Sequence, residues 1–278
     1  MALNHGEEMT SVLVSAERQP LAARERRRVA RGLFEAARSG QPIEPLSGRF
    51  SALTVADAQR VRDATLAYRL ATGERLIGAK VSVPEAPGRQ PLASEPALGW
   101  ITDAMMLPGN VVNPGELIRP RVEPRLALML DRSVRKRMAT VGELLAAVVA
   151  AFPALEIVDS RYDHDDLTVV DHVADNCGAA RLLIGRSVAP PAEGTLRRLR
   201  LPLSMNGALP PPSDRTVAPA LSALEASVWL ANALTTTRYD ITGGALLVVP
   251  AGDAAVDLRP GVHVQTHDPE LGSLELWG

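Results

Sequence analysis

The chain has 278 residues, a formal net charge of −2 at pH 7 and a pI near 6.2, which gives no reason to expect nucleic acid or an anionic membrane as partner. Its longest apolar stretches, such as 144–155, are far shorter than the roughly 20 residues that a membrane-spanning helix needs. The polar start predicts no signal peptide, and the single cysteine, Cys177, excludes an internal disulfide. Together these features predict a cytoplasmic location.

Four helices are predicted in chain order. An apolar stripe at three-, four- and seven-residue spacing marks the first, over 22–36. The second begins at Thr54–Asp57, which reads as a capping box with Asp in place of Glu, and ends at Gly73. A closer capping-box match opens a third helix over 140–151, and an apolar stripe predicts a fourth over 218–234.

Short runs rich in β-branched residues predict strands between these helices. They lie at 76–83, 154–158, 181–184, 245–249 and 262–266. Segments rich in Pro and Gly predict turns at 84–96, 190–194 and 209–214.

One further strand carries charged side chains. Apolar residues alternate from Val122 to Leu130, with Pro124 among them, so one face of this segment should lie in a core. Successive side chains of a strand point to opposite faces. Glu123 and Arg125 should therefore project together from the other face, where a site could form.

Five segments together resemble the 2-oxopent-4-enoate hydratase and 4-oxalocrotonate decarboxylase group of the fumarylacetoacetate hydrolase superfamily. The resemblance covers the chain from about residue 54 to the end. The segments are Ile77-Gly78-Ala79-Lys80-Val81, Arg119-Pro120-Arg121-Val122-Glu123-Pro124-Arg125, Pro153-Ala154-Leu155-Glu156-Ile157-Val158-Asp159-Ser160-Arg161, Ala174-Asp175-Asn176 and Ser227-Val228-Trp229-Leu230-Ala231-Asn232-Ala233-Leu234. The chain departs from the family pattern at Ser82, where the family has Gly, and at Cys177-Gly178-Ala179, where it has Ala-Ser-Ser.

The resemblance implies an α+β fold, a fumarylacetoacetate hydrolase-like mixed β-roll over 76–278 preceded by a helical part over 1–75. It also implies a divalent cation, usually magnesium, held by a Glu-x-Glu motif and a third Glu. Glu123 and Glu156 match the first and third ligands, but Arg125 stands at the second.

A guanidinium cannot be a metal ligand, because it carries a permanent positive charge. Glu123, Arg125 and Glu156 sum to −1, as three carboxylates and a dication would. We therefore hypothesise that Arg125 takes the place of the cation. Two alternatives remain open: Arg125 makes only a structural ion pair in a dead site, or Glu123 and Glu156 alone hold magnesium or manganese.

Lys80 matches the active-site Lys of the family. It could hold a substrate carboxylate as a cation or, if desolvated, act as a base or Schiff-base amine, whereas a structural role would lay its stem along apolar surface. Asn176 and Cys177 are candidates for substrate contact, although a lone Cys near an apolar segment more often packs. His172 either borders the site or is a structural histidine.

The sequence thus predicts a lyase- or isomerase-type enzyme for a small 2-oxo or enolisable acid, working without a divalent metal. The predicted catalytic residues are Lys80, Glu123, Arg125 and Glu156, and the predicted substrate-binding residues are Arg125, Lys80, Asn176 and Cys177. The alternatives are a non-catalytic ligand-binding or partner subunit, and a magnesium-dependent hydratase or decarboxylase. The expected partner is a small organic acid, and the resemblance implies a homo-oligomer.

Overall fold

The computed structural model describes residues 21–83, 96–133, 140–210, 221–239, 241–252 and 254–278. Its helices are α1 (Ala23–Ser39), α2 (Leu46–Arg49), α3 (Val55–Ala71), α4 (Val141–Leu145), α5 (Val169–Ala174), α6 (Glu193–Arg198) and α7 (Ala223–Leu234). Three single-turn 3-10 segments are η1 (Asp103–Met105), η2 (Pro114–Glu116) and η3 (Asn176–Gly178).

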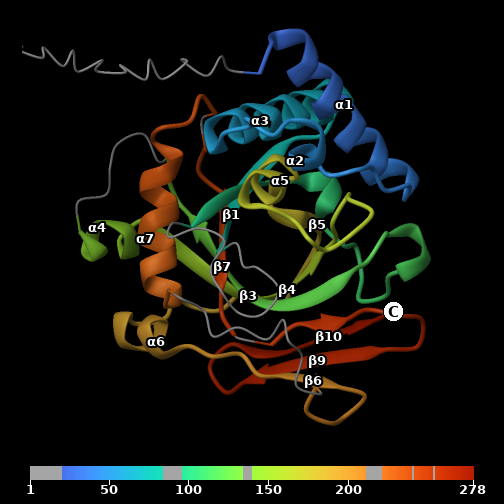
Figure 1. Ribbon diagram of the computed structural model, residues 1–278. Coiled ribbons are helices and arrows are strands. Elements are labelled where there is room, and N and C mark those ends of the chain that lie inside the picture. Colours follow the sequence, from blue (N-terminus) through green and yellow to red (C-terminus); the bar gives the residue numbers. More distant parts are fainter. Residues whose placement is uncertain (1–20, 84–95, 134–139, 211–220, 240, 253) are drawn as a thin grey trace, which may run out of the picture.

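A curled sheet of seven strands forms the centre of the molecule (Figure 1). Its strands are β1 (Leu76–Ser82), β2 (Ala97–Thr102), β3 (Arg121–Leu130), β4 (Val148–Val158), β5 (Ala179–Ile184), β7 (Leu246–Pro250) and β8 (Val256–Asp257). The order is β2-β1-β7-β3-β4-β5, with β8 beside the start of β3. Of the pairs in this sheet only β1–β7 is parallel. This mixed sheet matches the predicted α+β fold with a β-roll.

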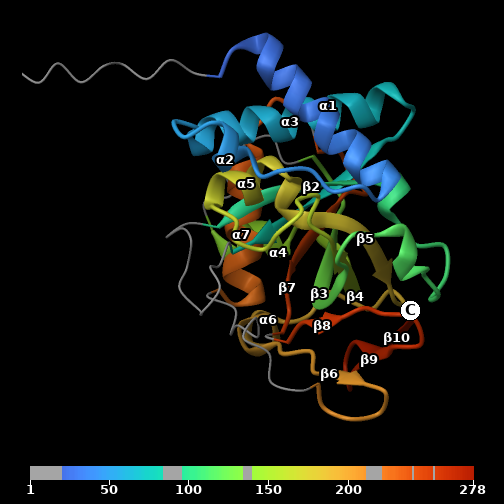
Figure 2. The same ribbon diagram turned by 45° about the vertical axis from the view of Figure 1, so that its right-hand side comes forward.

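A second, three-stranded sheet lies below the first, as Figures 1 and 2 show. It has the order β10-β9-β6, and its strands are β6 (Leu203–Met205), β9 (His263–Asp268) and β10 (Gly272–Trp277). A cluster of buried apolar residues that includes Leu155, Ile157, Val264 and Leu276 fills the space between the two sheets.

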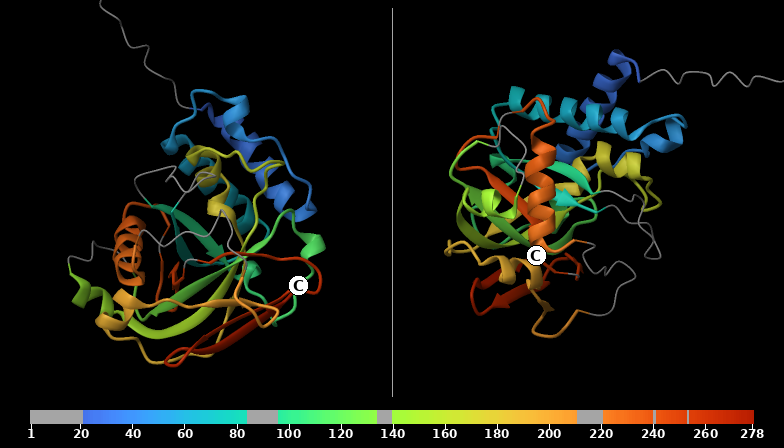
Figure 3. Two further views of the ribbon diagram at one scale, coloured as in Figure 1. Left: turned by 60° about the horizontal axis from the view of Figure 1, so that its bottom comes forward. Right: turned by 90° about the vertical axis from the view of Figure 1, so that its left-hand side faces the viewer.

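Helices cover the curled sheet from two sides. The helices α1 and α3 pack on each other, and α3 also packs on α5, at the end of the roll seen at the top of Figure 1. Helix α7 lies against β1 and β7, and it is the orange helix in the right-hand view of Figure 3. No helix in the described part of the chain is both long and apolar enough to cross a membrane.

Pro124 lies inside a central strand without breaking it. Proline cannot donate a hydrogen bond and is normally excluded from such positions. On one side of β3, however, the pairing with β8 ends at Val122 and the pairing with β7 begins at Arg125. Pro124 therefore falls in the gap between two partners, and its carbonyl still accepts a hydrogen bond from Ala251 N at 3.2 Å.

The first two predicted helices are confirmed. Helix α3 has the predicted capping box between Thr54 and Asp57, and the left-handed Gly73 follows its end. Helix α7 begins at Ala223, after its cap Ser222, and residues 218–220 of that prediction lie outside the described residues.

The predicted helix over 140–151 is wrong beyond its first turns. Its capping box is present, but α4 ends at Leu145 and β4 begins at Val148. The Ala and Leu residues of this segment favour a helix, but pairing along the whole length of β3 overrides that local preference. The predicted strand over 154–158 is accordingly the second half of a longer one.

The strand predictions at 76–83, 181–184, 245–249 and 262–266 correspond to β1, β5, β7 and β9. The predicted turns at 84–96 and 209–214 lie largely outside the described residues. The predicted division into a helical part over 1–75 and a β-roll over 76–278 stays a prediction.

Candidate functional site

Four charged side chains that the sequence singled out meet on one face of the curled sheet. Glu123 on β3 lies directly opposite Glu156 on β4. Arg125 follows two residues later, on the same face as Glu123, and Lys80 on β1 reaches the group across β7. We call Lys80, Glu123, Arg125 and Glu156 the strand cluster.

Lys80 has no solvent exposure. Its ammonium group contacts Glu156 Oε1 and donates to the carbonyl of Cys177 at 2.9 Å. A buried charge is tolerated only when it is paired, and Glu156, which is also fully buried, supplies the counter-charge. The structural role considered for Lys80, with its aliphatic stem along apolar surface and no ionic partner, therefore does not apply.

Arg125 lies between the two carboxylates. Its Nη2 is 2.5 Å from Glu123 Oε2, its Nε is 2.7 Å from Glu156 Oε2, and its Nη1 donates to the carbonyl of Val81 at 3.3 Å. Burial alone would lower the pKa of Arg125, but Glu156 and then Glu123 raise it above its ordinary value. The guanidinium is therefore permanently charged where the hypothesis placed a cation.

The strand cluster balances its own charge. Lys80 and Arg125 contribute two positive charges, and Glu123 and Glu156 two negative ones. Burial would raise the pKa of Glu123, yet Arg125 and Lys80 hold it below its usual range, so this carboxyl group is ionised. The sequence estimate of −1 left out Lys80, and with it the sum is zero.

A divalent cation does not fit this arrangement. Magnesium needs several oxygen ligands around it, but each carboxylate of the strand cluster already contacts a cationic side chain. The described residues contain no group of three or more His, Cys, Asp or Glu side chains that could hold a metal ion. We therefore derive no step through a metal at these residues.

The η3 turn brings a backbone carbonyl to Lys80. Asn176, Cys177 and Gly178 have φ angles of 54°, 54° and 70°, a left-handed conformation that is costly for residues with a side chain. The turn packs on β2 at Gly99, where an added Cβ would lie 2.9 Å from Lys80 Cγ and 2.8 Å from Asn176 O. Gly99 is thus required for the close approach of β2, the turn and Lys80.

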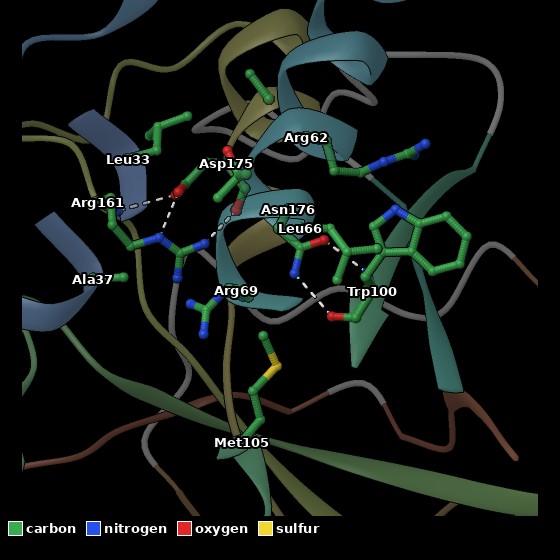
Figure 4. Close-up of a pocket in the computed structure, with 12 residues that line it drawn as sticks. Leu33, Ala37, Arg62, Leu66, Arg69, Trp100, Met105, Arg161, Asp175 and Asn176 are labelled. Atoms are coloured by element: carbon green, nitrogen blue, oxygen red, sulfur yellow. Dashed lines mark hydrogen bonds and ion pairs between the residues drawn. The ribbon is translucent and has the colours of Figure 1, made fainter. Parts of the chain in front are cut away.

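A buried ion pair holds this turn from behind (Figure 4). Arg161 contacts both the carboxylate and the carbonyl oxygen of Asp175, and it donates to the carbonyls of Asp159 at 2.6 Å and Ala179 at 3.1 Å. Burial raises the pKa of Asp175 to about 6 although Arg161 opposes this. We call Arg161, Asp175 and these carbonyls the turn network.

Beside the turn network lies a cavity of about 10 Å³, which is room for one water molecule. Arg62, Arg69 and Arg161 line it, and each contacts a neighbouring carboxylate. A substrate would not fit in this space.

Asn176 and Cys177, predicted to bind substrate, have structural contacts. The Asn176 side chain accepts from Trp100 N at 2.7 Å and donates to Trp100 O at 2.9 Å, so it pairs with β2 like a neighbouring strand. The Cys177 thiol is buried, which raises its pKa to about 11 and keeps it protonated. Their role toward a substrate stays a prediction.

His172 lies near the strand cluster and pairs with Ser82. Its Nε2 is 3.0 Å from Ser82 Oγ. Burial, and next the charge of Lys80, lower the pKa of His172 to about 3, so the ring is neutral at physiological pH. The sequence left open whether His172 borders the site or is a structural histidine, and Ser82 in place of the family's Gly was a signal that a side chain contacts this strand.

Access differs sharply within the site. Lys80 and Glu156 are fully buried and Arg125 is 4% exposed, whereas the side chain of Glu123 is 27% exposed. His172 is partly exposed as well. A ligand would therefore meet Glu123 and His172 first, with Arg125 behind Glu123.

Several known proteins are similar to this chain over most of its length. The 2-keto-4-pentenoate hydratase of Paraburkholderia xenovorans is 30% identical, over 90% of this chain and 93% of that protein. The 4-oxalocrotonate decarboxylase of a Pseudomonas species is 32% identical, over 89% and 95%. The 2-hydroxyhexa-2,4-dienoate hydratase of Comamonas testosteroni is 34% identical, over 73% and 78%. No protein-family model matches the chain.

Solved structures show the same fold. The 4-oxalocrotonate decarboxylase of Pseudomonas putida G7, complexed with magnesium and adipate, superposes with a TM-score of 0.80 at 24% identity, covering 94% of this chain and 99% of that one. A fumarylacetoacetate isomerase/hydrolase-like protein of Oleispira antarctica gives a TM-score of 0.51 at 15% identity, covering 72% and 93%. The chain belongs to the family of the 2-keto-4-pentenoate hydratases and 4-oxalocrotonate decarboxylases, and it has the fumarylacetoacetate hydrolase-like fold.

Proposed function

We propose that this protein is a lyase- or isomerase-type enzyme for a small 2-oxo or enolisable acid, and that the guanidinium of Arg125 does the electrostatic work that a divalent cation does in a metal-dependent relative. The observation that carries the proposal is the position of Arg125, with one carboxylate on each side at 2.5 Å and 2.7 Å. The names of the relatives, hydratases and a decarboxylase of 2-oxo acids, support the reaction class.

The reaction of such an acid passes through an enolate, whose negative charge must be stabilised. Lys80 and Arg125 place two fixed positive charges beneath Glu123, and fixed charges in a water-poor site stabilise developing charge strongly. The substrate carboxylate would pair with Arg125, since a guanidinium can grip a carboxylate in bidentate fashion.

Glu123 is the better candidate to move the proton. It is ionised and partly exposed, as a general base that must reach the substrate has to be. Glu156 is fully buried between Lys80 and Arg125. It would act by holding the two cations in place.

The closed state of the strand cluster favours a second candidate function. A non-catalytic ligand-binding or partner subunit needs no open pocket, and the cluster satisfies its own charge without a ligand. A third possibility, a magnesium-dependent hydratase or decarboxylase, is suggested by the magnesium in the related decarboxylase structure. It requires the carboxylates to leave their cationic partners.

Calorimetric titration of the chelator-treated protein separates these functions. We would titrate with oxalate, a mimic of the enolate of a 2-oxo acid, and separately with magnesium, in the wild type, in Arg125→Ala and in Arg132→Ala. Arg132 is an exposed arginine whose Nε lies 3.7 Å from Asp131, so it controls for loss of a charge elsewhere.

The proposal expects oxalate to bind without metal, to lose that binding in Arg125→Ala and to keep it in Arg132→Ala. Magnesium binding to the wild type at micromolar to low-millimolar strength would overturn the replacement by Arg125 and return the chain to the metal-dependent class. Binding of neither would favour the non-catalytic subunit.

A further inference from the structure

We propose that the neutral imidazole of His172 is a further catalytic residue of this site, a hydrogen-bond donor to the enolate oxygen, and that Ser82 sets its tautomer. This inference rests on the proposed function, because it concerns the same enolate.

The contact between the two residues fixes the ring. Ser82 lies two residues after Lys80 on β1, so both side chains project from the same face of the strand. Its hydroxyl is 3.0 Å from His172 Nε2. If Ser82 donates to Nε2, the ring proton must be on Nδ1, which has no hydrogen-bond partner among the described residues.

The contact with Ser82 places His172 beside the strand that carries Lys80, and burial keeps its ring neutral. Lys80 on β1, Glu123 and Arg121 on β3, and Arg161 after β4 all act on its pKa, and burial with Lys80 lowers it to about 3. A neutral imidazole is a poor base but a good donor, and a carboxylate base combined with a neutral imidazole donor is an established way to form an enolate. Glu123 and His172 are both partly exposed.

Glu123 and His172 together supply every protein group that the proposed step needs. Glu123 takes the proton from C3 of the 2-oxo acid, and the electrons of that C–H bond form the C2=C3 double bond. The carbonyl electron pair moves to the C2 oxygen, which accepts a hydrogen bond from His172 Nδ1. Return of a solvent deuteron from Glu123 to C3 reverses the step.

Exchange of the C3 hydrogens of 2-oxobutanoate with D2O, followed by proton NMR on the chelator-treated full chain, tests this step. We expect His172→Ala to lower the maximal exchange rate about 100-fold, as loss of an oxyanion donor does, with little change in KM. His172→Gln, which keeps an N–H donor, should restore much of the rate, and Ser82→Ala should lower it less than His172→Ala.

The chain offers a matched control pair. His267 Nδ1 lies 2.9 Å from Ser273 Oγ on the exposed surface of β9 and β10. His267→Ala and Ser273→Ala therefore remove a His–Ser contact of the same kind at a place away from the site. Both should leave the exchange rate unchanged. Nitrogen-15 NMR of labelled histidine should show the Nδ1–H tautomer of His172 in the wild type and a changed tautomer in Ser82→Ala.

The outcomes separate this inference from the proposed function. A wild-type exchange rate in His172→Ala, with loss of exchange in Glu123→Gln, would overturn the role of His172 and leave the function standing. An Nε2–H tautomer in the wild type would overturn both the role of Ser82 and the donation from His172 Nδ1, and it would leave the proposed function standing. No exchange in the wild type would overturn both proposals.

Discussion

Two buried groups of charges lie on either side of the η3 turn, and they are built differently. In the turn network, Arg161 makes four contacts to Asp175 and to backbone carbonyls, each a fixed acceptor. In the strand cluster, Arg125 makes three contacts, two of them to side chains, and one of these side chains is partly exposed. In the turn network both ionic side chains are buried, whereas the strand cluster includes one partly exposed carboxylate, that of Glu123.

This difference separates a structural ion pair from a candidate site. A buried pair whose donors end on a buried carboxylate and on backbone carbonyls fixes a conformation, here the left-handed turn at Asn176 and Cys177. A buried cluster that ends on a partly exposed carboxylate can exchange that partner for a ligand. If this distinction holds, the two groups will respond differently when each is broken.

The largest effect should follow removal of Arg161. Arg161→Met leaves Asp175 buried without its partner, and breaking a buried ion pair in this way costs about 3 to 5 kcal/mol. Arg125→Met should cost less, about 1 to 3 kcal/mol, because Lys80 still neutralises Glu156 and water reaches Glu123. Urea unfolding of both variants measures the difference, and equal losses would show that the strand cluster is as structural as the turn network.

The next effect concerns the position of Arg125 in the strand cluster. Arg125→Glu recreates the third carboxylate that the family resemblance implies, so magnesium should bind and stabilise the fold. Magnesium at about 100 times its Kd would add about 2.7 kcal/mol to the free energy of unfolding. Thermal unfolding with and without magnesium tests this, with Arg132→Glu as the control that should not respond. A wild type that gains as much stability from magnesium would contradict the exclusion of a cation by Arg125.

The sequence predicted the strand cluster well because strands obey a simple period. Alternation along 122–130 placed Glu123 and Arg125 on one face, and a charge sum that left out Lys80 led to the hypothesis that Arg125 replaces a cation. Arg125 does lie between two carboxylates, while the replacement of a cation and a role in a reaction stay proposals. The resemblance supplied Lys80 and Glu156, which no periodicity indicates.

The turn network and the His172 pair could not be predicted in the same way. Arg161, Asp175 and Asn176 were visible only as motif residues, because most of their partners are backbone groups that come together only in the folded turn. His172 and Ser82 are 90 residues apart in the chain and meet only when α5 packs beside β1. The end of α4 was missed because pairing with β3 is a long-range effect that local propensity does not contain.

A smaller effect should appear in the pH dependence of stability. The pKa of His172 is about 3 in the folded protein against an ordinary 6.5, so between these values the unfolded chain binds a proton that the folded one does not. Stability should therefore fall as pH falls through this window, by about 1.4 kcal/mol per pH unit. Burial gives Asp175 the opposite trend between about pH 4 and 6, so the wild-type curve alone is ambiguous.

The difference between the wild type and His172→Gln removes that ambiguity, because Asp175 is present in both. The difference should change with pH between 6.5 and 3 and stay constant above 7, as measured by urea unfolding at a series of pH values. His267→Gln, at an exposed histidine away from the site, is the matched control for the loss of an imidazole. A flat difference for His172→Gln would mean that the ring is solvated and does not sense Lys80.

The smallest effect should be the coupling between the two groups of charges. Arg125 shares no partner with Arg161, so the stability losses of Arg125→Met and Arg161→Met should add within about 0.5 kcal/mol in a double-mutant cycle. Lys80 differs, because it donates to the carbonyl of Cys177, two residues after Asp175. The cycle of Lys80→Met with Arg161→Met should therefore show a coupling above about 0.5 kcal/mol. Strong coupling in the Arg125 cycle would make the strand cluster and the turn network one structural unit, and the distinction between a site and its support would then be lost.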